Sequence, residues 1–199
     1  VVAGIGQLQQ HEDIRHAGFY GEYYTLSEPA AAPITCDIGL VDLRSSVNLP
    51  IQGYAGGTDS PLDCLPNYQP NTDVLVIRRA GTTVTAAGSL AATEVYIQAR
   101  SDSSVIDTGA DPTVFNLTKR DGATPADIRK LVTHIYYVRN CSDCAGGDNI
   151  PTLARAELVN GNLNTVFSIV NSPGSHVGLD GGRLPVDCLE PKRHQALDP

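Results

Sequence analysis

Two cysteines three positions apart, Cys141 and Cys144, form the clearest chemically reactive motif of this chain. The C-x-x-C spacing occurs in dithiol–disulfide oxidoreductases and in zinc sites. A thioredoxin-like site needs a helix that starts at the motif, whereas residues 145–151 are rich in glycine and polar turn formers. Zinc needs four ligands, and Cys188 with His194 supplies only a loose second pair. The motif therefore favours a small disulfide loop in a hairpin turn, with a redox enzyme and a zinc site as alternatives.

The cysteines as a group indicate an oxidising compartment. The chain has five, all in contexts rich in turn-forming residues. Spacing alone allows several pairings. We predict that Cys36 pairs with Cys64 and that Cys141 pairs with Cys144, which leaves Cys188 as the odd thiol.

The histidines do not form a recognisable catalytic or metal site. They are scattered along the chain, as His11, His16, His134, His176 and His194. On a helix, His11 and His16 would lie about 140° apart, too far for joint ligation of one metal ion. His134 would be the base for a cysteine nucleophile, but it falls in the middle of a predicted strand. A solvated helix face and a structural strand position are the interpretations we favour.

Other catalytic patterns are equally weak. The chain contains no G-x-S-x-G, H-E-x-x-H or Walker sequence. Two glycine-rich acidic turns, 56–59 and 146–149, lack the spacing of a calcium loop and suit at most weak calcium binding. We therefore predict no enzyme, no catalytic residue, no cofactor and no metal site.

Composition and charge narrow the class of protein. The 199 residues carry a formal net charge of -8, which disfavours binding to nucleic acid. No apolar run is long enough to span a bilayer. The sequence has no methionine and begins at Val1, so we expect it to be a piece of a longer protein whose membrane segment lies upstream.

Residues 1–17 are predicted to form a helix at the start of the chain. Val2, Ile5 and Leu8 recur every three positions, and Ala17-Gly18 supplies a stop. We expect the apolar side of this helix, near Ile5, Leu8 and Ile14, to pack on a sheet.

The rest of the chain predicts one α+β domain over 1–199, with the helix packed on a mostly antiparallel sheet. Residues 19–72 read as a long excursion with brief strands, tied by Cys36 and Cys64. Residues 73–170 read as the sheet, and 171–199 as an irregular tail. The predicted strands are 73–79, 94–100, 114–117, 131–139, 153–159 and 163–170. Asn160-Gly161 predicts a hairpin between the last two, and residues 125–129 suggest one helical turn.

Three segments resemble the minor pilins of the PilW type from type IV pili. Residues 9–21 contain D-I-R-H-A-G-F-Y-G, similar to the family's D-x-R-x-A-G-[FY]-x-G segment after its long helix. Residues 71–80 contain D-V-L-V-I-R-R, similar to the family's D-V-L-x-[VI]-R-R strand. Residues 134–139 and 150–159 resemble its Y-Y-V … P-x-L-x-R-x-E-L hairpin. The segments occur in the family's order.

The resemblance implies a structural role rather than catalysis. Members are anchored in the inner membrane by the N-terminal helix and face the periplasm. They bind other minor pilins in a complex that primes pilus assembly and caps the tip, so the expected location after assembly is the pilus tip or cell surface. The major pilin is a further expected partner, and contribution to adhesion or twitching motility would follow.

We expect partners to contact the N-terminal helix and the strand edges beside it. The interaction candidates are Ile5, Leu8, Phe19, Tyr20, Tyr23 and Tyr24. For Tyr20, Tyr23 and Tyr24, we favour packing of the helix onto the sheet over contact with a partner. The alternative functions are a pseudopilin of type II secretion, a surface adhesin module, and a secreted enzyme that uses Cys141 and Cys144.

Overall fold

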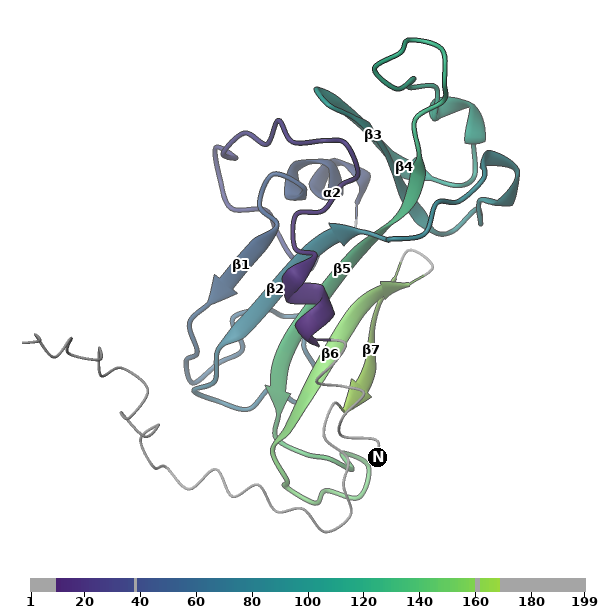
Figure 1. Cartoon of the computed structure of the whole chain (residues 1–199). Coiled ribbons are helices and arrows are strands. Elements are labelled where there is room, and N and C mark those ends of the chain that lie inside the picture. Colours follow the sequence, from purple (N-terminus) through teal and green to yellow (C-terminus); the bar gives the residue numbers. More distant parts are fainter. Residues whose placement is uncertain (1–9, 38, 160–161, 169–199) are drawn as a thin grey trace, which may run out of the picture.

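The computed structural model describes residues 10–37, 39–159 and 162–168. They form a mixed α+β fold built on a seven-stranded sheet in which every strand pairing is antiparallel (Figure 1). The strands are β1 (Ile51–Tyr54), β2 (Val74–Ala80), β3 (Val95–Arg100), β4 (Ser103–Thr108), β5 (Ile128–Arg139), β6 (Thr152–Val159) and β7 (Asn162–Ser168).

The long strand β5 organises the sheet. Its first residues pair with β3, its middle pairs with β2, and its end pairs with β6. The strand order is β1-β2-β5-β3-β4, with β6 and β7 following from the other end of β5. The predicted meander over 131–170 is therefore confirmed as β5, β6 and β7. The turn at Asn160-Gly161 lies outside the described residues.

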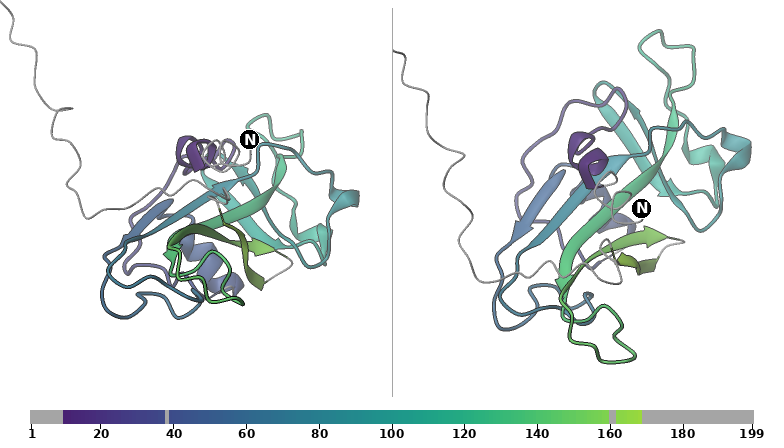
Figure 2. Two further views of the ribbon diagram at one scale, coloured as in Figure 1. Left: turned by 90° about the horizontal axis from the view of Figure 1, so that it is seen from below. Right: turned by 60° about the horizontal axis from the view of Figure 1, so that its bottom comes forward.

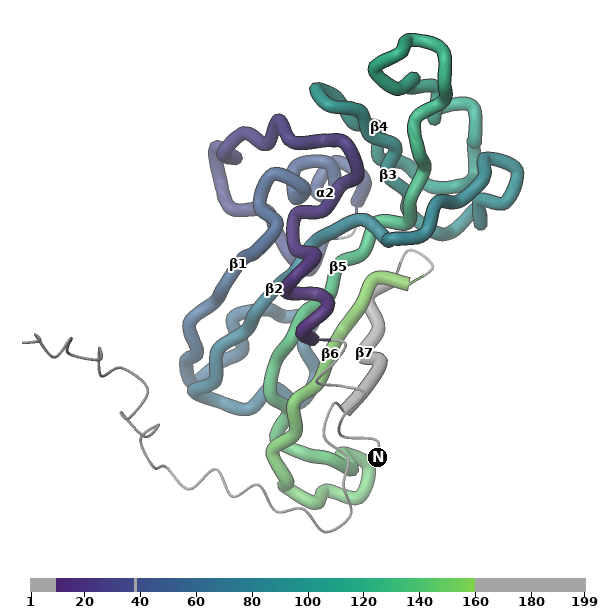
Figure 3. Tube along the Cα trace, in the orientation of Figure 1, coloured from purple at the N-terminus to yellow at the C-terminus, as the bar shows by residue number. Residues whose placement is uncertain are grey.

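Two helical segments cover opposite faces of the sheet. Residues 10–15 are helical and lie in front of β2, β5 and β6, whereas α2 (Leu40–Ser46) lies behind the sheet (Figures 1 and 2). The chain leaves the first helix, runs past the end of β2 and reaches the other face, a path that Figure 3 shows as a trace. The sheet is thus the middle layer.

The main apolar core lies on the α2 side. Val76 and Ile135 have no exposed surface, and a neighbouring cluster joins Leu43 and Val47 to the sheet. Alternation along the strands explains this, because successive side chains point to opposite faces. The other face carries fewer apolar residues, and this is the face that the first helix covers.

Several predictions about local structure were wrong. Residues 114–117 are not a strand: Val114 ends the 3₁₀ turn Pro112–Val114, and residues 115–117 have no regular secondary structure. Residues 125–129 are not a helical turn, because β5 begins at Ile128. β1 agrees with the brief strands predicted for the excursion over 19–72, but the helix α2 and the strand β4 were not predicted. A further 3₁₀ turn spans Ala87–Ser89.

The predicted helix is confirmed only over residues 10–15, since Ile5 and Leu8 lie outside the described residues. Ile14 does not face the sheet, with 48% of its surface exposed. Its neighbour Asp13 points inward instead and is 2% exposed. The polar residue rather than the apolar one therefore anchors this helix.

Candidate functional site

Asp13 is the centre of a buried polar network between the first helix and the sheet. One carboxylate oxygen, Oδ1, accepts from Arg79, with Nε at 2.9 Å and Nη2 at 2.8 Å. The other oxygen, Oδ2, lies 2.6 Å from His134 Nδ1 and accepts from the hydroxyl of Tyr136. Three side chains from two strands thus hold one helical carboxylate.

Strand register explains why these residues meet. Residues directly opposite in an antiparallel pair share a face of the sheet. His134 lies opposite Glu157 on β6, and Tyr136 lies opposite Arg155. Arg79 lies on the same face of β2, two positions after the partner of His134. We call this set the helix–sheet joint; its members are Asp13, Arg79, His134, Tyr136, Arg155 and Glu157.

The joint continues from β5 to charged residues of β6. His134 Nε2 lies 3.2 Å from Glu157 Oε2, which accepts from Arg155 at 3.0 Å. Both imidazole nitrogens therefore face carboxylate oxygens, which accept hydrogen bonds and do not donate them. The imidazole of His134 therefore lies between the carboxylates of Asp13 and Glu157.

The environment keeps the acids of the joint ionised. Burial works to raise the pKa of Asp13, but hydrogen bonds from His134, Tyr136 and Arg79 hold that pKa well below its usual range. The His134 hydrogen bond likewise lowers the pKa of Glu157. Burial, with the carboxylate of Asp13, raises the pKa of Tyr136. The phenol therefore remains a donor.

The joint suits holding an element in place rather than catalysis. Each of its acids accepts from basic groups in the same network. Asp13 and His134 are at most a tenth exposed, so a solute has little access to them. A buried network of satisfied charges fixes one geometry, because any displacement leaves a charge unpaired.

A second buried basic residue, Arg78, ties the excursion over 19–72 to the face of the sheet that α2 covers. Arg78 is 2% exposed and donates to the Leu49 carbonyl at 2.9 Å, to Gln52 Oε1 at 2.8 Å and to Thr35 Oγ1 at 3.1 Å. No carboxylate within the described ranges forms an ion pair with it. The Arg78-Arg79 pair therefore connects both covering layers to β2, one arginine for each face.

The aromatic interaction candidates separate into buried and exposed side chains. Tyr20 is 1% exposed and packs in the core with Leu43, so its assignment as a contact residue was wrong. Phe19 and Tyr23 are partly buried against the same cluster. Only Tyr24, at 78% exposed, is available to a partner.

The two disulfides join the predicted pairs, Cys36 with Cys64 and Cys141 with Cys144. The second closes the loop between β5 and β6, and Cys141 is 5% exposed. Residues 144–147 form turns rather than a helix, so the geometry of a thioredoxin-like site is missing there. Cys188 lies outside the described residues.

The carboxylate of the acidic turn 146–149 accepts hydrogen bonds from the backbone. Asp148 accepts from the amides of Ser142, Asp143 and Ile150. Within the ranges that the structure describes, no three His, Cys, Asp or Glu side chains gather as a metal site. The helices of this same part of the chain include none with the length and hydropathy to cross a membrane.

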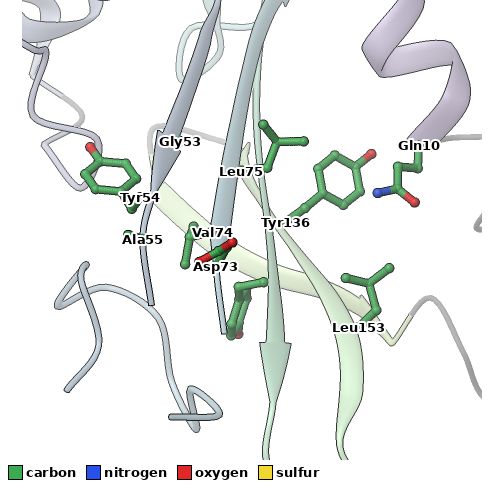
Figure 4. Close-up of a pocket in the computed structure, with 10 residues that line it drawn as sticks. Gln10, Gly53, Tyr54, Ala55, Asp73, Val74, Leu75, Tyr136 and Leu153 are labelled. Carbon is green, nitrogen blue, oxygen red and sulfur yellow. The ribbon is translucent and has the colours of Figure 1, made fainter. Parts of the chain in front are cut away.

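A shallow groove lies beside the joint, on the same face of the sheet. It has a volume of about 510 Å³, and Figure 4 shows Leu75, Tyr136 and Leu153 with Gln10 at one end and Gly53 at the other. The lining is mainly apolar. Gln10 is the first described residue of the helix, so the groove lies where that helix enters the described structure.

Sequence reasoning missed the joint, although one signal was present. Polar residues recur at alternate positions in otherwise apolar strands: His134 and Tyr136 in β5, Arg155 and Glu157 in β6. Such a stripe on one sheet face predicts a buried polar contact with a covering element.

Searches against protein-family models, curated proteins and solved structures found no match for this chain.

Proposed function

We propose that this chain is the globular domain of a minor pilin, a structural subunit that takes part in type IV pilus assembly by binding other minor pilins. The observation that carries the proposal is the convergence of the resembling segments on one site. The segment 9–21 supplies Asp13, the segment 71–80 supplies Arg79, and the last segment supplies His134 and Glu157. Segments that serve a common purpose are expected to meet in this way.

The joint supports a role in which the helix attaches the domain to the membrane and to neighbouring subunits. In the proposed subunit, the N-terminal helix anchors the domain in the inner membrane and contacts neighbouring subunits. Such a helix must not turn or slide against its domain. A buried carboxylate held by three side chains opposes both motions, because rotation of the helix would expose or unpair it.

The groove supports helix packing on this face of the sheet. Its lining near Leu75 and Leu153 is mainly apolar, and Gln10 of the helix lies at one end. In the proposed subunit, the N-terminal helix packs on such an apolar surface, which is the pilin-like packing that the sequence resemblance implies.

The proposed location is the periplasmic side of the inner membrane, and the pilus tip or cell surface after assembly. The two disulfides suit an oxidising compartment. The proposed partners are other minor pilins and the major pilin, with contacts through the helix and exposed residues such as Tyr24.

Co-purification of the full-length protein from its own cells tests the proposal. The expected result is recovery of other minor pilins, together with loss of surface pili in a deletion strain. Normal piliation without the protein, combined with no associated pilin, would overturn the proposal.

A matched pair of variants tests whether the joint serves assembly. Asp13→Asn removes the buried charge, whereas Glu12→Gln changes an exposed acid one position away whose Arg15 pair is long, at 3.8 Å. With equal protein levels in the cell, the first variant is expected to restore few pili to the deletion strain and the second to restore them fully. Equal rescue by both variants would argue against the joint's role.

A further inference from the structure

The outer edge of β1 has unpaired backbone groups. Arg78 donates its backbone N–H to the Pro50 carbonyl at 2.8 Å, which fixes the hydrogen-bonded positions of this strand pair. Because those positions alternate in an antiparallel ladder, the backbone groups of Ile51 and Gly53 point away from β2. None of the other described segments forms a backbone hydrogen bond with them. β1 is an edge strand with open donors and acceptors (Figure 1).

The β4 edge is protected, in contrast. Arg44 of α2 donates from Nε to the Ile106 carbonyl at 3.0 Å and from Nη2 to Asp107 at 2.9 Å. A covering arginine and a charged strand residue are common means of preventing strand addition. β1 has neither, since its four residues, Ile-Gln-Gly-Tyr, are all uncharged.

Exposed apolar surface lies at the β1 edge. Ile51 is 52% exposed on the groove side, where a side chain at Gly53 would meet no other atom within 4 Å. A strand added to β1 would bury side chains against Ile51. Its groove-side residue would enter the open space at Gly53, beside Ala55 (Figure 4).

We infer that the β1 edge is a strand-addition site for an extended, uncharged segment of a different subunit. Main-chain hydrogen bonds would supply the affinity, and the alternate side chains would supply the selectivity. A second copy of this chain fits less well, because each copy carries a net charge of -8. The inference rests on the proposed function for the identity of that subunit, a minor pilin, and on the structure alone for the site.

The test places a photo-cross-linking amino acid at position 51 of the full-length protein in its own cells. Position 84 serves as the matched control, because Val84 is 49% exposed in a loop away from this edge. The expected result is a cross-link from position 51, but not from 84, to an extended segment of another minor pilin, mapped by mass spectrometry.

Backbone variants then identify the kind of contact. Gly53→Pro removes an outward N–H, and a Cβ at this position meets no atom within 4 Å, so the sheet should form normally. It is expected to lower the cross-link yield about five- to tenfold, the effect of about one lost hydrogen bond with added steric exclusion. Gly53→Ala retains the N–H and should lose less. Circular dichroism and thermal melting check that both variants fold.

The outcomes separate the two proposals. A proline-sensitive cross-link from position 51 to a protein other than a pilin would support the edge site and overturn the proposed function. Recovery of minor pilins with a cross-link that Gly53→Pro leaves unchanged, or with none at position 51, would overturn the edge site alone. A cross-link to a second copy of the chain would overturn the inferred occupant.

Discussion

Asp13 and His134 lie 121 positions apart in the sequence, yet Oδ2 of the first and Nδ1 of the second are 2.6 Å apart in a buried contact. The contact joins the first helix to the central strand of the sheet. Because Arg79 and Tyr136 hold the same carboxylate, removal of Asp13 would leave several polar groups without their acceptor. The consequences are measurable in the isolated domain.

Asp13→Ala is expected to destabilise the domain by about 3 kcal/mol, because breaking a buried ion pair leaves its partners uncompensated. Chemical denaturation followed by circular dichroism measures the change. Glu12→Ala is the control, since this exposed residue should contribute less than about 1 kcal/mol. Equal losses for the two variants would contradict the importance of the buried contact.

The joint also predicts acid sensitivity. The pKa of Asp13 and that of Glu157 are both lowered in the folded protein. A lowered folded pKa adds stability above the unfolded value, and this stability is lost as pH falls through the folded pKa. The free energy of unfolding should therefore decline as pH falls below about 4, near the ordinary values for Asp and Glu.

Denaturation curves between pH 7 and pH 2 test this dependence. In Asp13→Asn the curve should be flatter over the acidic range, because one lowered pKa is removed. An unchanged slope in that variant would show that other acids cause the decline.

The strands were predictable where alternation and apolar runs are long. β2, β3, β5 and β6 each begin within three residues of their predicted start, because side-chain burial on a sheet imposes a period of two. α2 was not predictable: it has only seven residues, and its burial depends on Leu43 contacting a sheet formed much later in the sequence. Short apolar runs fit a helix or a strand equally well.

The joint was less predictable than the strands. The contacts of Asp13 join residues 66 to 123 positions apart, and the local sequence around Asp13 does not specify them. Apolar spacing instead suggested that Ile14 faces the sheet, but the strong pairing partners of Asp13 turn the helix the other way. Paired charges can override an apolar preference at one position, because burying an unpaired charge costs more than exposing one isoleucine.

Arg78→Lys should destabilise the domain by about 2 kcal/mol, although the charge is retained. The guanidinium donates to three acceptors from two separate nitrogens, and the compact ammonium of lysine, which lacks this planar fork and reaches less far, cannot satisfy all of them. Arg44→Lys is the matched control, because its side chain is half exposed and its ion pair is on the surface. A small and equal effect of both changes would contradict the role of Arg78 in holding the excursion.

The two disulfides should contribute unequally to stability. Cys36 and Cys64 are 28 positions apart, whereas Cys141 and Cys144 are three apart. In the chain-entropy model, the larger loop gives about 3.5 kcal/mol and the smaller about 2 kcal/mol, because cross-linking distant residues restricts the unfolded chain more. Replacing each pair with serines and measuring urea denaturation tests the difference.

The double variant that lacks Cys36 and Cys64 should lose more stability. It should also loosen the 33–36 segment that Arg78 and Gln52 hold, and faster amide hydrogen exchange in this segment would reveal the change. Equal losses would mean that native contacts around Cys36, rather than loop length, determine the contribution of its disulfide.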